Sequence, residues 1–500
     1  MRIFFFIFFL LIAIISKAQF LGLDKDEWLR RQQLLGEYSA NTSFMVRPVA
    51  KQDSTNKVLE ILPFQLNTKF NSHHPYGWND QGMIMAKGLQ TMFSAGIKAN
   101  YGPLEIQLQP EYYYAANPNY ATTAGYGSAA GKSFSKLYGG QSAIKLNLGP
   151  ITLGASTQNL WWGPGQFSSL MMSNNAPGFL HYTFNTNKPI QTPIGSFECQ
   201  LVIGKLNEDT TKAFENSFLK PFNPRNEDRF FNGVVITYQP KFLPNIFLGV
   251  TRSEHLYTSD RNKRTGLSKY VPVLLGASPE ANASTASIPS DGAFSFFGRW
   301  ILPKNKAEFY IEWGYNDFKQ NFRDLAVNPS HAAALIAGFK KIVPIKNNQL
   351  LDISGEITQM AQTPSYILRN AGNWYVHGGV SQGFTYQNQI MGAGSGFGNN
   401  VQTLQVKKIN GQEYIGIKLQ RIQQDPKGLG GPTSNLLMRP IQWNDVAIGF
   451  LAQKKFNDFW LTGEIQFVNS TNYGWEKGNA FNLFATINAR YILPKRGGKP

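Results

Sequence analysis

Residues 481–491 read FNLFATINARY, and this stretch near the C-terminus decides the fold. Apolar side chains fall on every second position, with polar side chains between most of them. Because a β-strand turns successive side chains to opposite faces, the pattern predicts a strand with one apolar face and one polar face. The apolar face carries Phe481, Leu483, Ala485, Ile487, Ala489 and Tyr491, opposite Asn482, Thr486, Asn488 and Arg490. Such a strand suits a wall between lipid and a polar lumen.

The same period of two recurs along most of the chain, for example in residues 104–108, 144–148, 309–315 and 415–419. A soluble β-sandwich also alternates, but it rarely needs strands of about ten residues with aromatic side chains near both ends. Counting the runs predicts roughly eighteen antiparallel strands in a transmembrane barrel. They are expected to begin near residues 58, 83, 101, 142, 151, 196, 231, 245, 293, 307, 331, 349, 375, 400, 414, 444, 459 and 481.

The composition agrees with an all-β transmembrane barrel. Aromatic residues are frequent (37 Phe, 21 Tyr and 10 Trp), whereas only 16% of residues are charged. After the first eighteen residues, no stretch contains eighteen consecutive apolar residues, which argues against helical membrane spans. A barrel gives this intermediate composition because each strand shows only half of its residues to lipid.

The N-terminus predicts export. Met1-Arg2 is followed by an apolar run from Ile3 to Ile15, and small residues precede Gln19. This arrangement predicts a signal peptide over residues 1–18, since the run is short for a permanent membrane anchor. The single cysteine, Cys199, is far from the cleavage site, which excludes both a lipidated mature N-terminus and an intramolecular disulfide. Together with the strand pattern, export places the protein in a bacterial outer membrane.

The remaining chain divides into three parts. Residues 19–55 are expected to form a short periplasmic helical segment, with a helix over 22–38; residues 56–494 form the barrel, and 495–500 form a basic tail. Tight connections at 101–103, 148–150, 410–411 and 457–458 predict periplasmic turns. Longer polar stretches at 116–140, 160–195, 207–230, 255–292 and 423–443 are expected to be extracellular loops or loops that plug the lumen.

The net charge of +17 becomes +15 once Arg2 and Lys17 leave with the signal peptide. A basic barrel would attract anionic glycans or the phosphates of lipopolysaccharide. Export argues against nucleic acid as a partner. The alternative is that the lysines and arginines are solvated loop residues.

The most distinctive motif is NLWWGPG at residues 159–165, followed by SSLMMSNNAP at 168–177. The indoles of Trp161 and Trp162 could stack on sugar rings, and the amides of Asn174 and Asn175 could hydrogen-bond hydroxyl groups. The alternative is that the tryptophans belong to the interfacial aromatic girdle and that the asparagines cap turns.

Basic loop residues form two other candidate sites. Arg225 and Arg229 lie in one polar loop that could bind an anionic sugar, and a second basic cluster around Tyr257 consists of Arg252, Arg261, Lys263 and Arg264. A guanidinium binds a uronate carboxylate in a bidentate manner, and a tyrosine can stack on a sugar ring. The alternative is that these cations pair with acidic neighbours such as Glu254 and Asp260.

No motif indicates catalysis, a metal or a cofactor. Glu308 and Glu312 share a strand face at about 13 Å, farther apart than the ~6.5–9.5 Å of an inverting glycosidase pair, so they are expected to be lumen charges paired with arginines. His73 and His74 are adjacent on an extended segment and would point apart, which disfavours a shared metal. We therefore expect no enzyme.

The tryptophan motif resembles the Wzi family of outer-membrane capsule assembly proteins, which carry a similar tryptophan-glycine-proline turn and double asparagine. Residues 201–206, 233–252 and 374–398 resemble later family segments in the same order. One departure is Gly178 after Ala176-Pro177, where relatives often place an arginine before the proline; a charged contact at this point is therefore not carried over from the family. The resemblance implies a barrel of about this strand number with periplasmic helices, acting as an outer-membrane lectin that helps tether exported capsular polysaccharide to the cell surface. We expect the barrel to be monomeric and to bind capsular or other surface polysaccharide.

Two other classes stay open. A porin-like channel for small solutes or oligosaccharides would have an open lumen, whereas loops packed inside would favour the lectin. A scaffold subunit of an export or motility machine would co-purify with a stable protein partner.

Overall fold

The computed structural model describes residues 23–48, 58–121, 130–211, 225–274, 288–316, 326–327, 329–361, 373–424 and 441–491. The expected signal peptide (1–18) and basic tail (495–500) lie outside these residues. Within the described ranges, none of the helices has the length and apolar character needed to cross a membrane.

The wall strands are β2 (Leu59–Asn71), β3 (Gly88–Tyr101), β4 (Leu104–Leu108), β5 (Glu111–Ala115), β6 (Phe134–Tyr138), β7 (Ala143–Leu148), β8 (Ile151–Ser156), β10 (His181–Thr186), β11 (Ile190–Thr192), β12 (Gly195–Leu206), β13 (Arg229–Pro240), β14 (Ile246–Tyr257), β15 (Asp291–Leu302), β16 (Ala307–Tyr315), β17 (Ala333–Pro344), β18 (Leu350–Gln359), β21 (Asn400–Asn410), β22 (Glu413–Gln423), β23 (Asn444–Phe456), β24 (Phe459–Thr471) and β25 (Asn479–Tyr491). The other elements are α2 (Leu23–Leu35), β1 (Val46–Arg47), β9 (Trp161–Trp162), α3 (Thr258–Asn262), η3 (Gly266–Lys269), η4 (Pro272–Leu274), η5 (Pro303–Asn305), β19 (Thr385–Tyr386), β20 (Gln389–Ile390) and η8 (Tyr473–Trp475).

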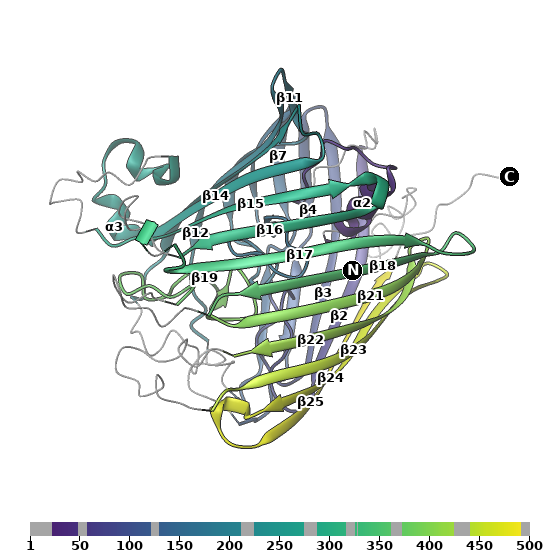
Figure 1. The fold of residues 1–500 in the computed structure, drawn as a ribbon. Coiled ribbons are helices and arrows are strands. Elements are labelled where there is room, and N and C mark those ends of the chain that lie inside the picture. The colour runs from purple at the N-terminus through teal and green to yellow at the C-terminus, as the bar shows by residue number, and fades with distance from the viewer. Residues whose placement is uncertain are drawn as a thin grey trace, which may run out of the picture.

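The wall strands form one closed antiparallel barrel (Figure 1). Three pairs of them, β4/β5, β6/β7 and β10/β11, are the halves of interrupted strands, because each pair continues along the same neighbour. The wall therefore has 18 strands, as the sequence predicted. The strand that decided the fold, β25, closes the ring by pairing with β2.

Alternation along each strand separates lipid from lumen. On β2, Phe64, Leu66 and Phe70 are 38–46% exposed on the outside, whereas Lys69 and Asn71 are buried on the inside. Residues of one strand that differ by two positions share a face, so the pattern repeats around the wall. The result is an apolar outer surface and a polar inner surface.

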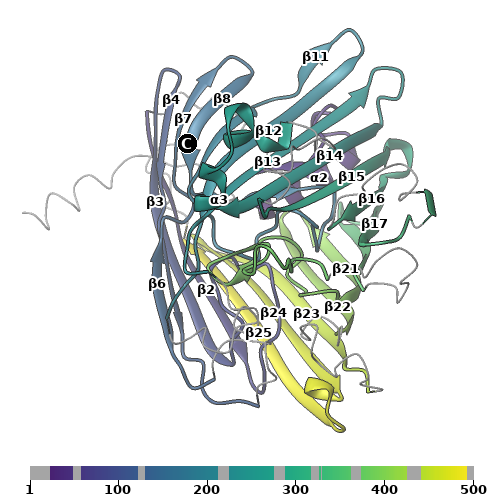
Figure 2. The ribbon, with the colours of Figure 1, turned by 90° about the vertical axis from the view of Figure 1, so that its left-hand side faces the viewer.

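The two ends of the barrel differ. The four predicted tight turns lie at one end, and Gly102 and Gly411 adopt the left-handed conformation there (φ +55° and +61°), which glycine tolerates without a Cβ clash. The long connections lie at the other end, which carries α3; Figure 2 views the barrel from that side. Short turns are periplasmic and long loops extracellular in outer-membrane barrels.

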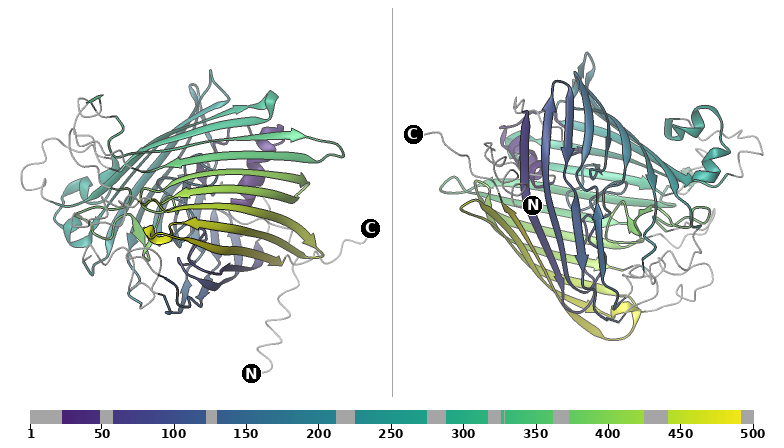
Figure 3. Two further views of the ribbon diagram at one scale, coloured as in Figure 1. Left: turned by 60° about the horizontal axis from the view of Figure 1, so that its bottom comes forward. Right: turned by 180° about the vertical axis from the view of Figure 1, so that it is seen from behind.

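Folded-in segments fill the lumen. We call residues 23–48, 72–87, 157–180 and 373–399 the plug. Trp162, Leu170 and Trp374 of the plug pack against Phe231 and Ile336 of the wall in one buried cluster. Figure 3 shows α2 within the outline of the barrel in two views.

One strand position was wrong. The sequence predicted a strand near residue 375, but residues 373–399 belong to the plug and contain only the short β19–β20 hairpin. The wall strand that completes the count is β10/β11, inside a stretch expected to be a loop. The aromatic side chains of Trp374 and Tyr375 pack in the core of the plug and do not face lipid.

Candidate functional site

The tryptophan motif lies inside the barrel. Strand β9 pairs with β1, so that Trp162 lies opposite Val46 and Trp161 opposite Arg47. Trp161 and Trp162 are 1% and 0% exposed. Trp162 donates its indole N–H to Oε1 of Gln200 on the wall (2.9 Å). Neither indole has a face open to the extracellular surface.

Buried carboxylates of the wall hold the loop that follows the tryptophans. Glu356 accepts hydrogen bonds from the backbone N–H groups of Gln166 (2.6 Å) and Phe167 (3.1 Å) and from the hydroxyl of Tyr310 (2.8 Å). Glu312 accepts from the hydroxyl of Ser295 (2.9 Å) and the N–H of Leu170 (3.4 Å). The expectation that Glu312 pairs with an arginine does not agree with these contacts.

The paired asparagines fasten parts of the plug to each other. The side chain of Asn175 donates to the carbonyl of Ile390 (2.9 Å), and the carbonyl of Asn174 accepts from the N–H of Gln81 (2.6 Å). The plug is therefore internally cross-linked across segments that are distant in sequence.

Ion pairs anchor α2 to the wall. Glu308 receives Arg30 from the helix (2.6 Å) and Arg299 from the neighbouring strand (2.5 Å), all three side chains being at most 3% exposed. Glu27 binds Lys407 on β21, three strands along the wall from β16 (2.8 Å). The predicted pairing of Glu308 with arginines agrees with these contacts.

The basic residues near Tyr257 divide into an inner and an outer group. Arg229 is buried and donates to the carbonyls of Gly383 and Thr385 (2.8 Å to the latter), besides its ion pair with Glu208. It therefore ties the plug to the wall and is not available at the surface.

The outer group surrounds α3 at the extracellular end. We call Arg225, Arg252, Tyr257, Arg261, Lys263, Arg264 and Tyr270 the outer cluster. Arg225 lies over the ring of Tyr257 (4.3 Å), and Arg261 lies over that of Tyr270 (5.4 Å). Tyr257 itself is buried, whereas Tyr270 is 54% exposed.

Acidic neighbours meet several cations of the outer cluster. Asp260 binds Arg225 (2.8 Å) and Lys263 (2.6 Å), and Arg264 binds Glu254 (2.6 Å). Burial opposes ionisation of Asp260, but Lys263 and Arg225 outweigh this effect and hold the pKa of Asp260 below its ordinary value. The side chains of Arg225 and Lys263 still expose 46% and 63% of their surface, so both can contact a further anion.

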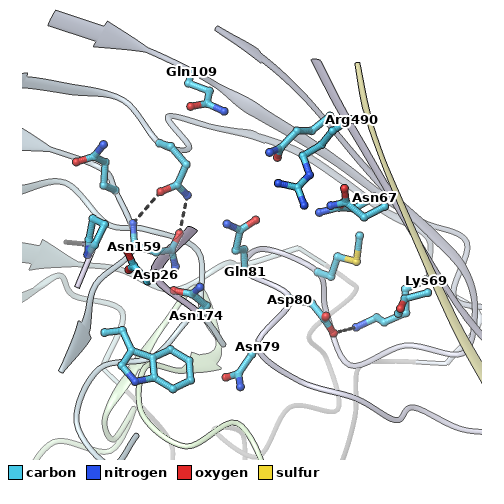
Figure 4. Close-up of a pocket in the computed structure, with 18 of the residues that line it drawn as sticks. Asp26, Asn67, Lys69, Asn79, Asp80, Gln81, Gln109, Asn159, Asn174 and Arg490 are labelled. Atoms are coloured by element: carbon cyan, nitrogen blue, oxygen red, sulfur yellow. Dashed lines mark hydrogen bonds and ion pairs between the residues drawn. The ribbon is translucent and has the colours of Figure 1, made fainter. Parts of the chain in front are cut away.

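A polar cavity of about 300 Å³ lies between the plug and the wall (Figure 4). Asn67, Gln109 and Arg490 of the wall lie across it from Gln81 and Asn174 of the plug. Half of the lining residues are amides, namely Gln65, Asn67, Asn79, Gln81, Gln107, Gln109, Gln141, Gln158, Asn159, Asn174 and Asn488. Trp161 also lines the cavity. Two of the predicted site residues, Trp161 and Asn174, therefore belong to its lining.

Sequence reasoning did not find this cavity. Its wall residues were visible only as the polar half of alternating strands, Asn488 and Arg490 among them. Which of those positions meet in space depends on strand register and on how the loops fold inward, and neither follows from strand periodicity.

The fold and the buried plug define a class: an outer-membrane β-barrel with a filled lumen. The family model described as "Capsule assembly protein Wzi" matches residues 70–483. The chain belongs to this family, and it is an outer-membrane protein.

Among solved structures, the chain is similar to Wzi of Escherichia coli, described as a carbohydrate-binding β-barrel involved in group 1 capsule assembly. The two share 12% identity with a TM-score of 0.63, over 96% of this chain and 99% of that one. The outer-membrane channel DcaP of Acinetobacter baumannii (8% identity, TM-score 0.35, 88% of this chain and 99% of that one) is also similar. OprD of Pseudomonas aeruginosa has 9% identity and a TM-score of 0.41, over 89% and 97%. No curated protein sequence matches the chain.

Proposed function

We propose that the protein is an outer-membrane lectin that binds exported capsular or surface polysaccharide and helps attach it to the cell. Membership in the capsule assembly family carries the proposal. The related E. coli protein, described as carbohydrate-binding, has the same barrel fold, which supports it. The proposal includes no catalytic step, and the protein acts as a monomer surrounded by lipopolysaccharide.

The outer cluster is the proposed surface contact. Arg225 and Lys263 are exposed cations at the extracellular end, and Tyr270 offers a ring beside Arg261. Cations of this kind bind the carboxylates of an acidic polysaccharide, and an aromatic ring stacks on the apolar face of a sugar. Trp161, Trp162, Asn174, Asn175 and Arg229 support this surface indirectly, through the plug.

Binding of the purified protein to acidic polysaccharide from the same cells tests the surface contact. Replacing both Arg225 and Lys263 by alanine should weaken binding at least several-fold and reduce its dependence on salt, because two exposed charges are lost. Lys304→Ala is the matched control, since Lys304 is an exposed cation in the short turn η5 at the other end. Equal affinities for the double variant and the control would reject the outer cluster as the contact.

A porin-like channel is the alternative function. Among the described residues the plug fills the lumen, which disfavours passage of solutes. Within the described ranges, no contact favours the channel specifically, so the lectin is retained.

A further inference from the structure

The cavity between plug and wall has the composition of a binding site for a neutral, hydroxyl-rich ligand. An amide side chain carries both an acceptor oxygen and two N–H donors, and a sugar hydroxyl likewise donates and accepts. Ligand pockets usually have apolar linings with a few polar groups, so a lining that is half amide is unusual. Amides are neutral, so this recognition does not depend on ligand charge.

Several polar atoms of the lining have no hydrogen-bond partner among the described residues. They are the amide oxygens of Asn79 and Asn488, the indole nitrogen of Trp161 and Nε of Arg47. Leaving a buried polar atom without a partner costs about 1–3 kcal/mol. Four residues of the lining therefore carry polar groups whose hydrogen-bonding capacity is not used within the described part of the protein.

The charges of the lining nearly cancel. Lys69 is paired with Asp80 at 2.9 Å, and Asp26 lies in the same lining as Arg47 and Arg490. Arg47 is already engaged, because it donates to the carbonyl of Gly165 (2.7 Å) and lies over the ring of Trp161 (4.7 Å). This balance favours a neutral ligand over a uronate or a phosphate.

We propose that this cavity is a second carbohydrate site, inside the barrel, that takes a neutral sugar unit. Its volume of about 300 Å³ is at the lower end for ligand pockets, which limits the ligand to about one or two sugar rings. Trp161 supplies an indole N–H, and the amides of Gln65 and Asn488 bind hydroxyl groups. The inference rests on the proposed function only for the class of ligand, since it concerns a site separate from the outer cluster.

Ligand-observed NMR on the full-length barrel tests the proposal. The probes are glucose, galactose and N-acetylglucosamine, with glucuronate as the charged counterpart, in a detergent whose headgroup is not a sugar. At least one neutral sugar should give a saturable signal and bind more tightly than glucuronate. Absence of binding by all three neutral sugars, as expected for a cavity that holds only water, would overturn the proposal, and so would preferential binding of glucuronate.

Matched variants locate the signal. Gln65→Leu and Asn488→Leu should each raise the Kd by about 3- to 10-fold, the loss expected for one hydrogen bond. Gln405→Leu is the control, because Gln405 is a buried amide on the wall that does not line the cavity. Equal effects of Gln65→Leu and Gln405→Leu would place the sugar elsewhere and overturn the proposal.

A second pair of variants guards against loss of folding. Trp161→Phe keeps an aromatic side chain, smaller than an indole, but removes the indole N–H, and should raise the Kd. Trp374→Phe makes the same change at a buried indole nitrogen outside the cavity that also lacks a partner among the described residues, and should leave the Kd unchanged. If neutral sugars do not bind while the outer cluster still binds polysaccharide, only this inference is rejected. If neutral sugars bind but the outer-cluster variant binds polysaccharide as the control does, only the proposed surface contact is rejected.

Discussion

Trp161 and Trp162 are adjacent but have different surroundings. Successive residues of a strand point to opposite sides, and β9 therefore sends Trp162 into the apolar core and Trp161 to the polar cavity. The sequence motif identified both as notable residues, but it could not separate these roles. The separation depends on the pairing of β9 with β1, whose partner residues are more than a hundred positions away.

Replacing Trp162 by alanine should destabilise the barrel. The side chain is fully buried, so the change leaves a large cavity and should lower the free energy of unfolding by roughly 3–5 kcal/mol. Denaturant unfolding of the refolded protein measures this effect. Trp162→Phe, which retains most of the packing, should cost clearly less; equal costs would contradict the packing role.

Asp260 should make α3 sensitive to acid. A carboxyl whose pKa is lowered in the folded state adds stability that is complete above its unfolded pKa and is lost as pH falls through the folded pKa. The loss should therefore occur below about pH 4. Below this pH, hydrogen exchange of residues 258–262, corrected for intrinsic rates, should accelerate in the wild type. In Asp260→Asn, which has no carboxylate to protonate at position 260, the same fall in pH should cause no such acceleration. Identical pH profiles would contradict a role for this carboxylate.

At the scale of elements, strand periodicity predicted most of the wall but not the plug. A long run such as β25 must alternate because lipid and lumen lie on its two sides. Residues 373–399 contain apolar and aromatic side chains for a different reason, because they pack inside the barrel. Their sequence pattern was therefore wrongly interpreted as a wall strand. The short β10 strand, in contrast, shows only Tyr182 and Phe184 outward and was hidden in an expected loop.

The helix α2 should detach from the wall when Glu308 is removed. Glu308→Ala leaves Arg30 and Arg299 as buried cations without their carboxylate, a change that costs about 3–5 kcal/mol. Protease accessibility of residues 23–48 in the intact barrel should increase. Glu413→Ala, at the start of β22, is the control, because Glu413 accepts a hydrogen bond from the N–H of Lys455 on the wall; equal protection in both variants would show that the ion pairs do not hold the helix.

At the scale of the whole molecule, the plug distinguishes a binding protein from a pore. Reconstituted in a planar bilayer, the wild type should show no porin-like conductance, because the plug occupies the lumen. Glu308→Ala combined with Glu356→Ala should produce openings, since these two carboxylates hold α2 and the loop after Trp162. A steady open channel in the wild type would favour the alternative function.

The fold class and the strand number follow from alternation, turn residues and the export signal. The amide-lined cavity does not, because its lining comes from residues between 26 and 174 and from residues 486–490, which meet only in the closed barrel. The two proposed sites differ accordingly. The residues of the outer cluster other than Tyr270 are near one another in sequence and were named from it, whereas the cavity depends on the register of the strands that line it and on how the plug folds inward.

The most direct test of the central claim is to delete the gene and to measure cell-bound and released polysaccharide separately. The account predicts normal synthesis with a larger released fraction, restored by the wild-type gene and restored less by a gene carrying Arg225→Ala and Lys263→Ala. An unchanged cell-bound fraction in the deletion strain would contradict the claim that this barrel attaches polysaccharide to the cell surface.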